Sequence, residues 1–115
     1  MEIREIKFKF REVDRDSFEA IRNGRKKVET RAASSKYSTI NSGDSIIIVC
    51  GSDKFVKIVK KATRFKSISE MLLRYKVEDI NPFVKSEEEL EKMYYSFPNY
   101  KEKIKDFGLM AYELK

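Results

Sequence analysis

A stretch rich in ionisable side chains lies at positions 24–31, which read Gly24-Arg25-Lys26-Lys27-Val28-Glu29-Thr30-Arg31. Side chains on a strand alternate between two faces, so Glu29 and Arg31 would share one face while Lys26 and Thr30 share the other. A glutamate and an arginine two residues apart can pair with each other or jointly bind a polar ligand. The alternative is a surface ion pair of little energetic value. The spacing leaves both interpretations open.

The residues before this stretch predict a helix that would position it. Residues 14–23 can form that helix, with Asp14 or Asp16 as the N-cap. The apolar side chains on one helical face are Val13, Phe18 and Ile21. Gly24 would end the helix, because glycine adopts the left-handed conformation without steric cost.

The chain contains no histidine and a single cysteine. Nucleophile systems that need a histidine, and zinc sites built from histidine or from several cysteines, are therefore excluded. Any catalysis must use lysine, carboxylates, tyrosine or threonine. A lysine acts as a base only when burial or a neighbouring cation lowers its pKa, and Lys26 has Arg25 and Lys27 beside it.

Periodicity predicts the remaining elements. Alternation of Ile3, Ile6, Phe8 and Phe10 with charged residues indicates a first strand. Further strands are expected at 46–50, 54–66 and 109–114, and a serine-rich loop at 32–42. Capping boxes at Ser67 and Ser86 predict helices over 68–75 and 87–97, with shorter ones at 77–81 and 100–105.

The predicted strand at 54–66 carries a basic strip without any acid: Lys54, Lys57, Lys60, Lys61, Arg64 and Lys66. Cations along its outer face could follow a phosphate backbone, which would add affinity without sequence specificity. The alternative is an edge strand that its lysines protect against aggregation.

Aromatic residues at two places in the sequence could stack on bases or pack inside the protein. One is Tyr37 in the serine-rich loop. The other is a cluster formed by Tyr94, Tyr95, Phe97 and Tyr100, a type of cluster that is more often core.

Length and composition indicate one globular domain spanning residues 1–115. The 115 residues are 41% hydrophobic, enough for one core without disulfides or metal. The net charge of +6 favours polyanionic partners, although a thermophilic surface has the same composition. Cys50 ends an apolar run and is expected to be a buried thiol in a reducing compartment. Without a signal segment or long apolar run, the protein is expected to be cytoplasmic, with no membrane contact.

The pattern G-x-K-x-x-E-x-R resembles that of the ASCH domain, a member of the PUA-like superfamily. It is preceded by Phe18-Glu19-Ala20-Ile21 and followed by residues 40–48 and 65–72, and the chain closes with Phe107-Gly108-Leu109-Met110-Ala111-Tyr112-Glu113-Leu114. Through these segments the resemblance to small archaeal single-domain members covers nearly the whole chain. It implies an α+β fold, a PUA-like β-barrel of about five to six strands with flanking helices. It also implies a role with RNA or modified nucleosides and a cleft lined by the motif.

The resemblance does not fix an activity, because such proteins include binding modules, amidohydrolases and reported nucleases. Amidohydrolase members pair the motif lysine with a glutamate from a later segment, which corresponds to Glu78 here. Those members have a threonine at the position of Glu29. Because Glu29 stands in its place, the nucleophilic hydroxyl of those members is missing here. Thr30 is not expected to replace it, since its side chain should point to the opposite strand face.

Two functional classes follow, besides a plain protein-interaction scaffold. In the first, the domain binds single-stranded RNA, tRNA or a modified nucleoside, through a nucleic-acid-binding set of Arg25, Lys26, Arg31, Lys57, Lys60, Lys61 and Arg64. In the second, a metal-independent hydrolase acts on RNA or on acylated nucleosides such as N4-acetylcytidine. Its catalytic set would be Lys26 or Glu29 as base, Glu78 as acid and Arg31 as anion stabiliser. No cofactor and no metal is expected, and a monomer is favoured.

Overall fold

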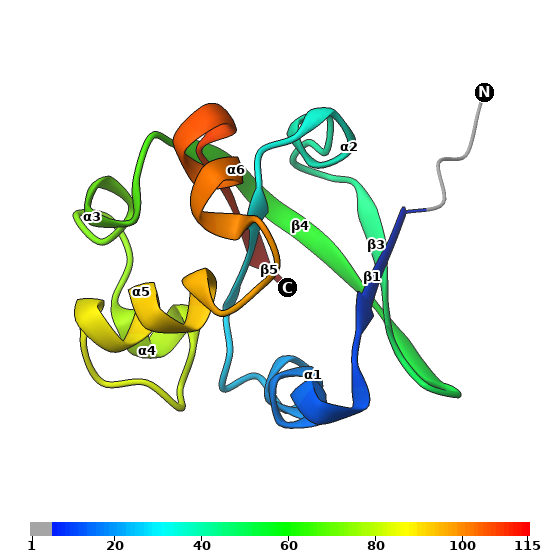
Figure 1. Ribbon diagram of the computed structural model, residues 1–115. Coiled ribbons are helices and arrows are strands. Elements are labelled where there is room, and N and C mark those ends of the chain that lie inside the picture. Colours follow the sequence, from blue (N-terminus) through cyan, green and yellow to red (C-terminus); the bar gives the residue numbers. More distant parts are fainter. Residues whose placement is uncertain (1–5) are drawn as a thin grey trace.

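A computed structural model of the chain describes residues 6–115 (Figure 1). In this range five strands form one curled half-barrel sheet accompanied by six α-helices, so the fold is α+β and PUA-like. The predicted fold class is confirmed, with five strands. Ile3 of the predicted first strand lies outside the described residues.

The sheet has the strand order β1-β3-β4-β5-β2. The first strand pairs in parallel with the third, and all other pairs are antiparallel. The strands are β1 (Ile6–Phe10), β2 (Val28–Ala32), β3 (Ser45–Cys50), β4 (Asp53–Phe65) and β5 (Leu109–Leu114).

β4 joins the two halves of the sheet. Its first half pairs with β3 and its second half with β5, and the register shifts between Val59 and Lys61. A bulge of this kind bends a strand and strengthens its twist. Each half of β4 therefore has a strand partner on one side only, and both interpretations of the basic strip stay predictions.

The helices follow the predicted order, except that a short helix at Ser35–Ser38 lies in the stretch predicted as a loop. The helix predicted at 100–105 extends to Phe107, and the others are shorter than predicted. They are α1 (Arg15–Arg22), α2 (Ser35–Ser38), α3 (Ile68–Met71), α4 (Val77–Ile80), α5 (Glu87–Tyr95) and α6 (Tyr100–Phe107), with a 3-10 turn, η1, at Glu12–Asp14. Both predicted serine N-caps are confirmed, because the Ser67 and Ser86 side chains accept from the amides of Glu70 and Glu89. Val13, predicted on the buried face of the first helix, is instead 79% exposed in η1.

Two hydrophobic cores lie on opposite faces of β5. Met110 and Tyr112 belong to the core inside the half-barrel, and Leu109 and Ala111 belong to the core under α3–α6. The first core takes in side chains of α1, and α1 and α2 lie at the two ends of the half-barrel (Figure 1). Cys50 is buried in the same core as a free thiol, as expected.

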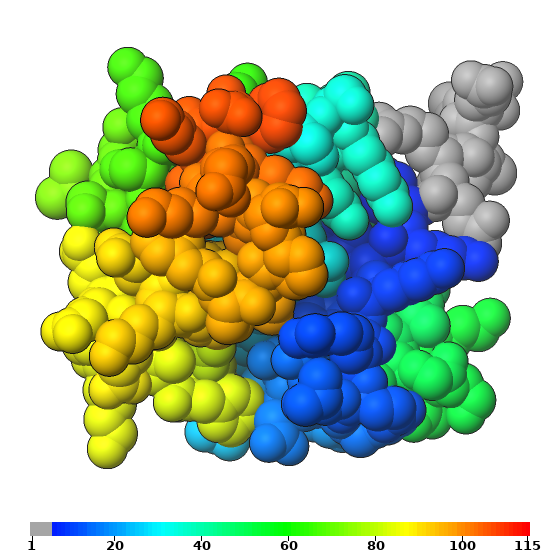
Figure 2. Space-filling model, in the orientation of Figure 1, coloured from blue at the N-terminus to red at the C-terminus, as the bar shows by residue number. Residues whose placement is uncertain are grey.

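The α5–α6 pair, in yellow and orange in Figure 1, lies in front of β2 and β5. On the surface, its atoms meet those of β1 and α1, in blue (Figure 2). Among residues 6–115, no helix is long and apolar enough to cross a membrane.

Candidate functional site

Lys26, Glu29 and Arg31 form a buried charged cluster at β2. The Lys26 ammonium lies 3.3 Å from Glu29 Oε1, and Arg31 Nη2 donates to Glu29 Oε2 at 3.0 Å. Lys26 and Glu29 are about 6% exposed, and the Arg31 side chain is 18% exposed. The interpretation as a surface ion pair is therefore wrong: the motif folds into the interior.

The turn before β2 explains how Lys26 reaches Glu29. Gly24 has a φ of +85°, and the Lys26 amide donates to the carbonyl of Ala20 at 2.9 Å, so the chain folds back onto the end of α1. Lys26 precedes the first residue of β2, and strand alternation does not fix its direction. Its ammonium donates to the carbonyl of Ile80 at the end of α4.

The cluster shifts the pKa of each of its members. Burial lowers the pKa of the Lys26 ammonium below its ordinary range, although the Glu29 carboxylate opposes that shift. For Glu29, burial favours the neutral acid, but Lys26 and Arg31 outweigh it and lower the pKa. With both cations protonated, one carboxylate balances only one of them, so the cluster keeps an excess positive charge.

Arg31 is held by aromatic rings. Its guanidinium lies 4.8 Å from the ring centre of Phe8, 5.1 Å from Phe10 and 5.8 Å from Tyr37. Tyr37 packs edge-on against Phe8, and its carbonyl accepts from the Tyr112 hydroxyl. Tyr37 therefore packs against the barrel and closes over Arg31, as one of its two alternatives predicted.

A cavity of about 530 Å³ opens beside this cluster. Residues 9–17 of β1, η1 and α1 form one wall, and β2 with the segments around α5 forms the other. The charged and aromatic side chains that line it include Phe10, Lys26, Glu29, Arg31, Phe97 and Tyr100.

Tyrosine hydroxyls extend the polar part of this wall. Thr30 and Tyr94 share a buried hydrogen bond, and the amide of Ala32 donates to the Tyr100 hydroxyl at 3.2 Å. The rings of Tyr94 and Tyr100 are stacked, with centres 6.3 Å apart. Of the predicted aromatic cluster, Tyr94 is core, whereas Phe97 and Tyr100 are partly exposed to the cavity.

Other predicted site residues lie outside this cavity. Arg25 is exposed and its guanidinium lies 5.5 Å from the Phe83 ring, at the cavity mouth. Glu78 is exposed on α4 and does not line the cavity. The predicted phosphate contacts on β4 do not line the cavity either; Lys57 is half-buried, and the exposed ones are Lys60, Lys61 and Arg64. Arg64 donates through Nε to the carbonyl of Phe107 at 2.9 Å.

Sequence reasoning missed Phe10 and Arg11, which the opposite wall contributes, and Phe83, which lies in the same wall as β2. All three line the cavity, although they lie outside the motif in the chain. The alternation that predicts β1 did place Phe10 on an apolar face, but no local pattern shows that this face meets Arg31. Within residues 6–115, no group of three or more acidic or cysteine side chains could hold a metal ion.

The family model of the ASCH domain matches residues 12–115. The chain belongs to the ASCH domain family. The crystal structure of hypothetical protein PH0355 is 33% identical with a TM-score of 0.83, and the match covers 97% of this chain and 98% of that one. The solution structure of protein PF0455 from Pyrococcus furiosus is 30% identical with a TM-score of 0.75, covering 97% and 96%. No curated protein matches this ASCH domain chain.

Proposed function

We propose that this ASCH domain binds RNA and holds one nucleotide in the cavity beside β2. The observation that carries the proposal is the buried cluster in which Lys26 and Arg31 share the one carboxylate of Glu29 beside a cavity rather than open solvent. The association of the ASCH family with RNA binding supports the same conclusion.

The cavity offers the groups that a nucleotide needs. Its volume of about 530 Å³ falls in the range of small-molecule sites. A guanidinium has five N–H donors in a planar fork, and among residues 6–115 Arg31 uses a side-chain donor for Glu29. Its other donors suit a phosphate or a base edge, and Glu29 and the aromatic rings fix the direction of the fork.

Fluorescence anisotropy with a labelled single-stranded RNA, tRNA and the four 5′-mononucleotides tests this proposal. Arg31→Lys keeps the charge but loses the fork, so we expect it to weaken mononucleotide binding roughly tenfold or more. The matched control is Arg64→Lys on β4, which removes an equal fork outside the cavity. Equal losses in both variants would contradict a site at Arg31.

A hydrolase is the second candidate, and the lowered pKa of Lys26 is the observation that favours it. A buried amine that loses its proton readily can serve as a general base on water or on a ribose hydroxyl. Arg31 would stabilise the developing anion. Glu29 is the carboxylate within reach of Lys26, whereas Glu78 does not line the cavity.

Incubation with RNA and with acylated nucleosides, scored for cleavage and deacylation, tests the second candidate. Lys26→Met removes the base and keeps its apolar stem, while Glu29 remains paired with Arg31. We expect product with the wild-type protein and none with the variant. Equal product from both would assign the activity to another site or to a contaminant.

A further inference from the structure

Two arginine–phenylalanine pairs stand at the mouth of the cavity. The Arg11 guanidinium lies 5.4 Å from the Phe97 ring centre, and that of Arg25 lies 5.5 Å from the Phe83 ring centre. Arg11, Phe83 and Phe97 all line the cavity. Neither pair takes part in the charged cluster at β2.

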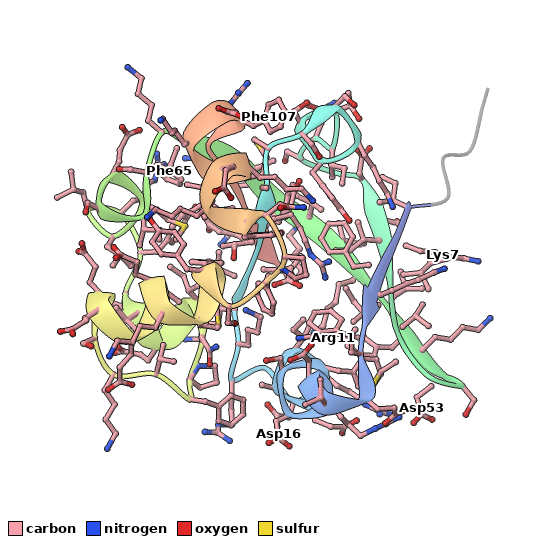
Figure 3. All side chains as sticks on the ribbon, viewed as in Figure 1. Lys7, Arg11, Asp16, Asp53, Phe65 and Phe107 are labelled. Carbon is pink, nitrogen blue, oxygen red and sulfur yellow. The ribbon has the colours of Figure 1, made fainter. Side chains whose placement is uncertain are left out.

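Each pair joins two segments that are distant in the chain. Arg11, labelled in Figure 3, follows β1, and Phe97 follows α5, so this pair spans the two walls of the cavity. Arg25 lies in the turn between α1 and β2, and Phe83 lies between α4 and α5. The two pairs thus occupy separate positions beside one opening.

The Phe83 ring is 47% exposed, and Val13, which also lines the cavity, is 79% exposed. Phe97 is half-buried, because it packs against the core under α3–α6. The Arg11 side chain is 62% exposed even though it pairs with Asp14. A phenylalanine ring that lines the cavity next to an exposed guanidinium gives a stacking surface and a phosphate donor at each position.

We propose that the mouth binds the nucleotides on either side of the one in the cavity, so that the ligand is a single-stranded RNA chain rather than a free nucleotide. This inference rests on the proposed function. One flanking base stacks on Phe83 and the other on Phe97, and the arginines donate to the adjoining phosphates. A base-paired duplex keeps its bases stacked inside the helix and cannot offer their faces to these rings.

Binding of hexaribonucleotides of each base, compared with the matching 5′-mononucleotide, tests the inference. We expect the hexamer to bind at least tenfold more tightly. Phe83→Ala and Phe97→Leu should each weaken hexamer binding roughly fivefold or more, because each loses the face for one stacked base. In each variant the loss of mononucleotide affinity should be smaller than the loss of hexamer affinity, because a mononucleotide has no flanking base to stack on the ring. Leucine at position 97 keeps an apolar contact with the core, so folding survives, as a thermal melt would verify.

Phe107→Ala is the matched control, because Phe107 is 42% exposed but lies away from Arg11 and outside the cavity (Figure 3). A hexamer that binds no more tightly than the mononucleotide would overturn the inference and leave the proposed function intact. An equal loss in Phe107→Ala would also overturn it. If neither ligand binds, the proposed function fails, and the inference fails with it.

Discussion

The protein presents cations in two regions that differ in almost every physical respect. At β2, Lys26 and Arg31 are buried, share one carboxylate and face a cavity. On β4, Lys60 and Lys61 are exposed and outside that cavity. The same residue types therefore give a fixed, directional site in one region and a screened, mobile charge in the other. A count of basic residues would not separate the two.

Removal of the shared carboxylate should have the largest effect. Glu29→Gln keeps the shape but leaves Lys26 and Arg31 buried without a counter-ion, so we expect a loss of about 3–5 kcal/mol in the free energy of unfolding. Chemical denaturation measures it. Lys60→Ala is the control and should stay within about 0.5 kcal/mol of wild type. A loss below about 1 kcal/mol in Glu29→Gln would mean that the two cations reach water.

Acid should lower the free energy of unfolding through the buried cluster at β2. The folded state lowers the pKa of Glu29 below its ordinary value of 4.5. The unfolded chain therefore takes up the proton first, and the contribution of Glu29 to stability is present above about pH 4.5 and lost as the pH falls through the folded pKa. We expect the free energy of unfolding to fall more steeply below about pH 4.5 in wild type than in Glu29→Gln. Parallel urea titrations at several pH values would show this, and equal slopes would contradict it.

The hydrogen bond behind the cluster should matter less. Thr30→Val leaves the buried Tyr94 hydroxyl without its partner, which should cost about 1–3 kcal/mol in the free energy of unfolding. Adding Tyr94→Phe removes the unpaired hydroxyl and should restore part of the loss. Strict additivity in this double-mutant cycle would mean that the two hydroxyls do not interact.

The strip on β4 should produce the smallest effect, limited to the salt dependence of binding. If Lys60 and Lys61 each contact a phosphate of single-stranded RNA, the double variant Lys60→Ala with Lys61→Ala should reduce the slope of log affinity against log salt by about 1.4. Mononucleotide affinity should not change. An unreduced slope would mean that Lys60 and Lys61 do not contact RNA. The two regions would then differ in function as well as in burial.

Much of the fold could be predicted from local patterns, because these patterns record which side chains face the core. The alternation around Phe8 and Phe10, the turn at Gly24 and the two capping boxes each predicted an element that the structure contains. Val13 shows where the approach fails, since it lies two residues before the first residue of α1 but still fits the spacing of the helical face.

Only one wall of the cavity could be predicted from the sequence. The motif supplied Lys26, Glu29 and Arg31, but strand alternation assigned Lys26 to the wrong side because it lies ahead of β2. The other wall depends on how β4 bends the sheet and brings β1 toward β2. That curvature arises from contacts between distant residues, and no local window contains it.

The pairing of β2 with β5 has a consequence for the order in which the chain is made. Val28 is aligned with Glu113, so the strand that carries the motif has no partner until the last strand has been synthesised. At about 5–20 residues per second, β2 waits for several seconds on the ribosome. During that time β2 lacks the strand that holds it in the cavity wall. A chain that stops before β5 would therefore not form the cavity beside Lys26, Glu29 and Arg31.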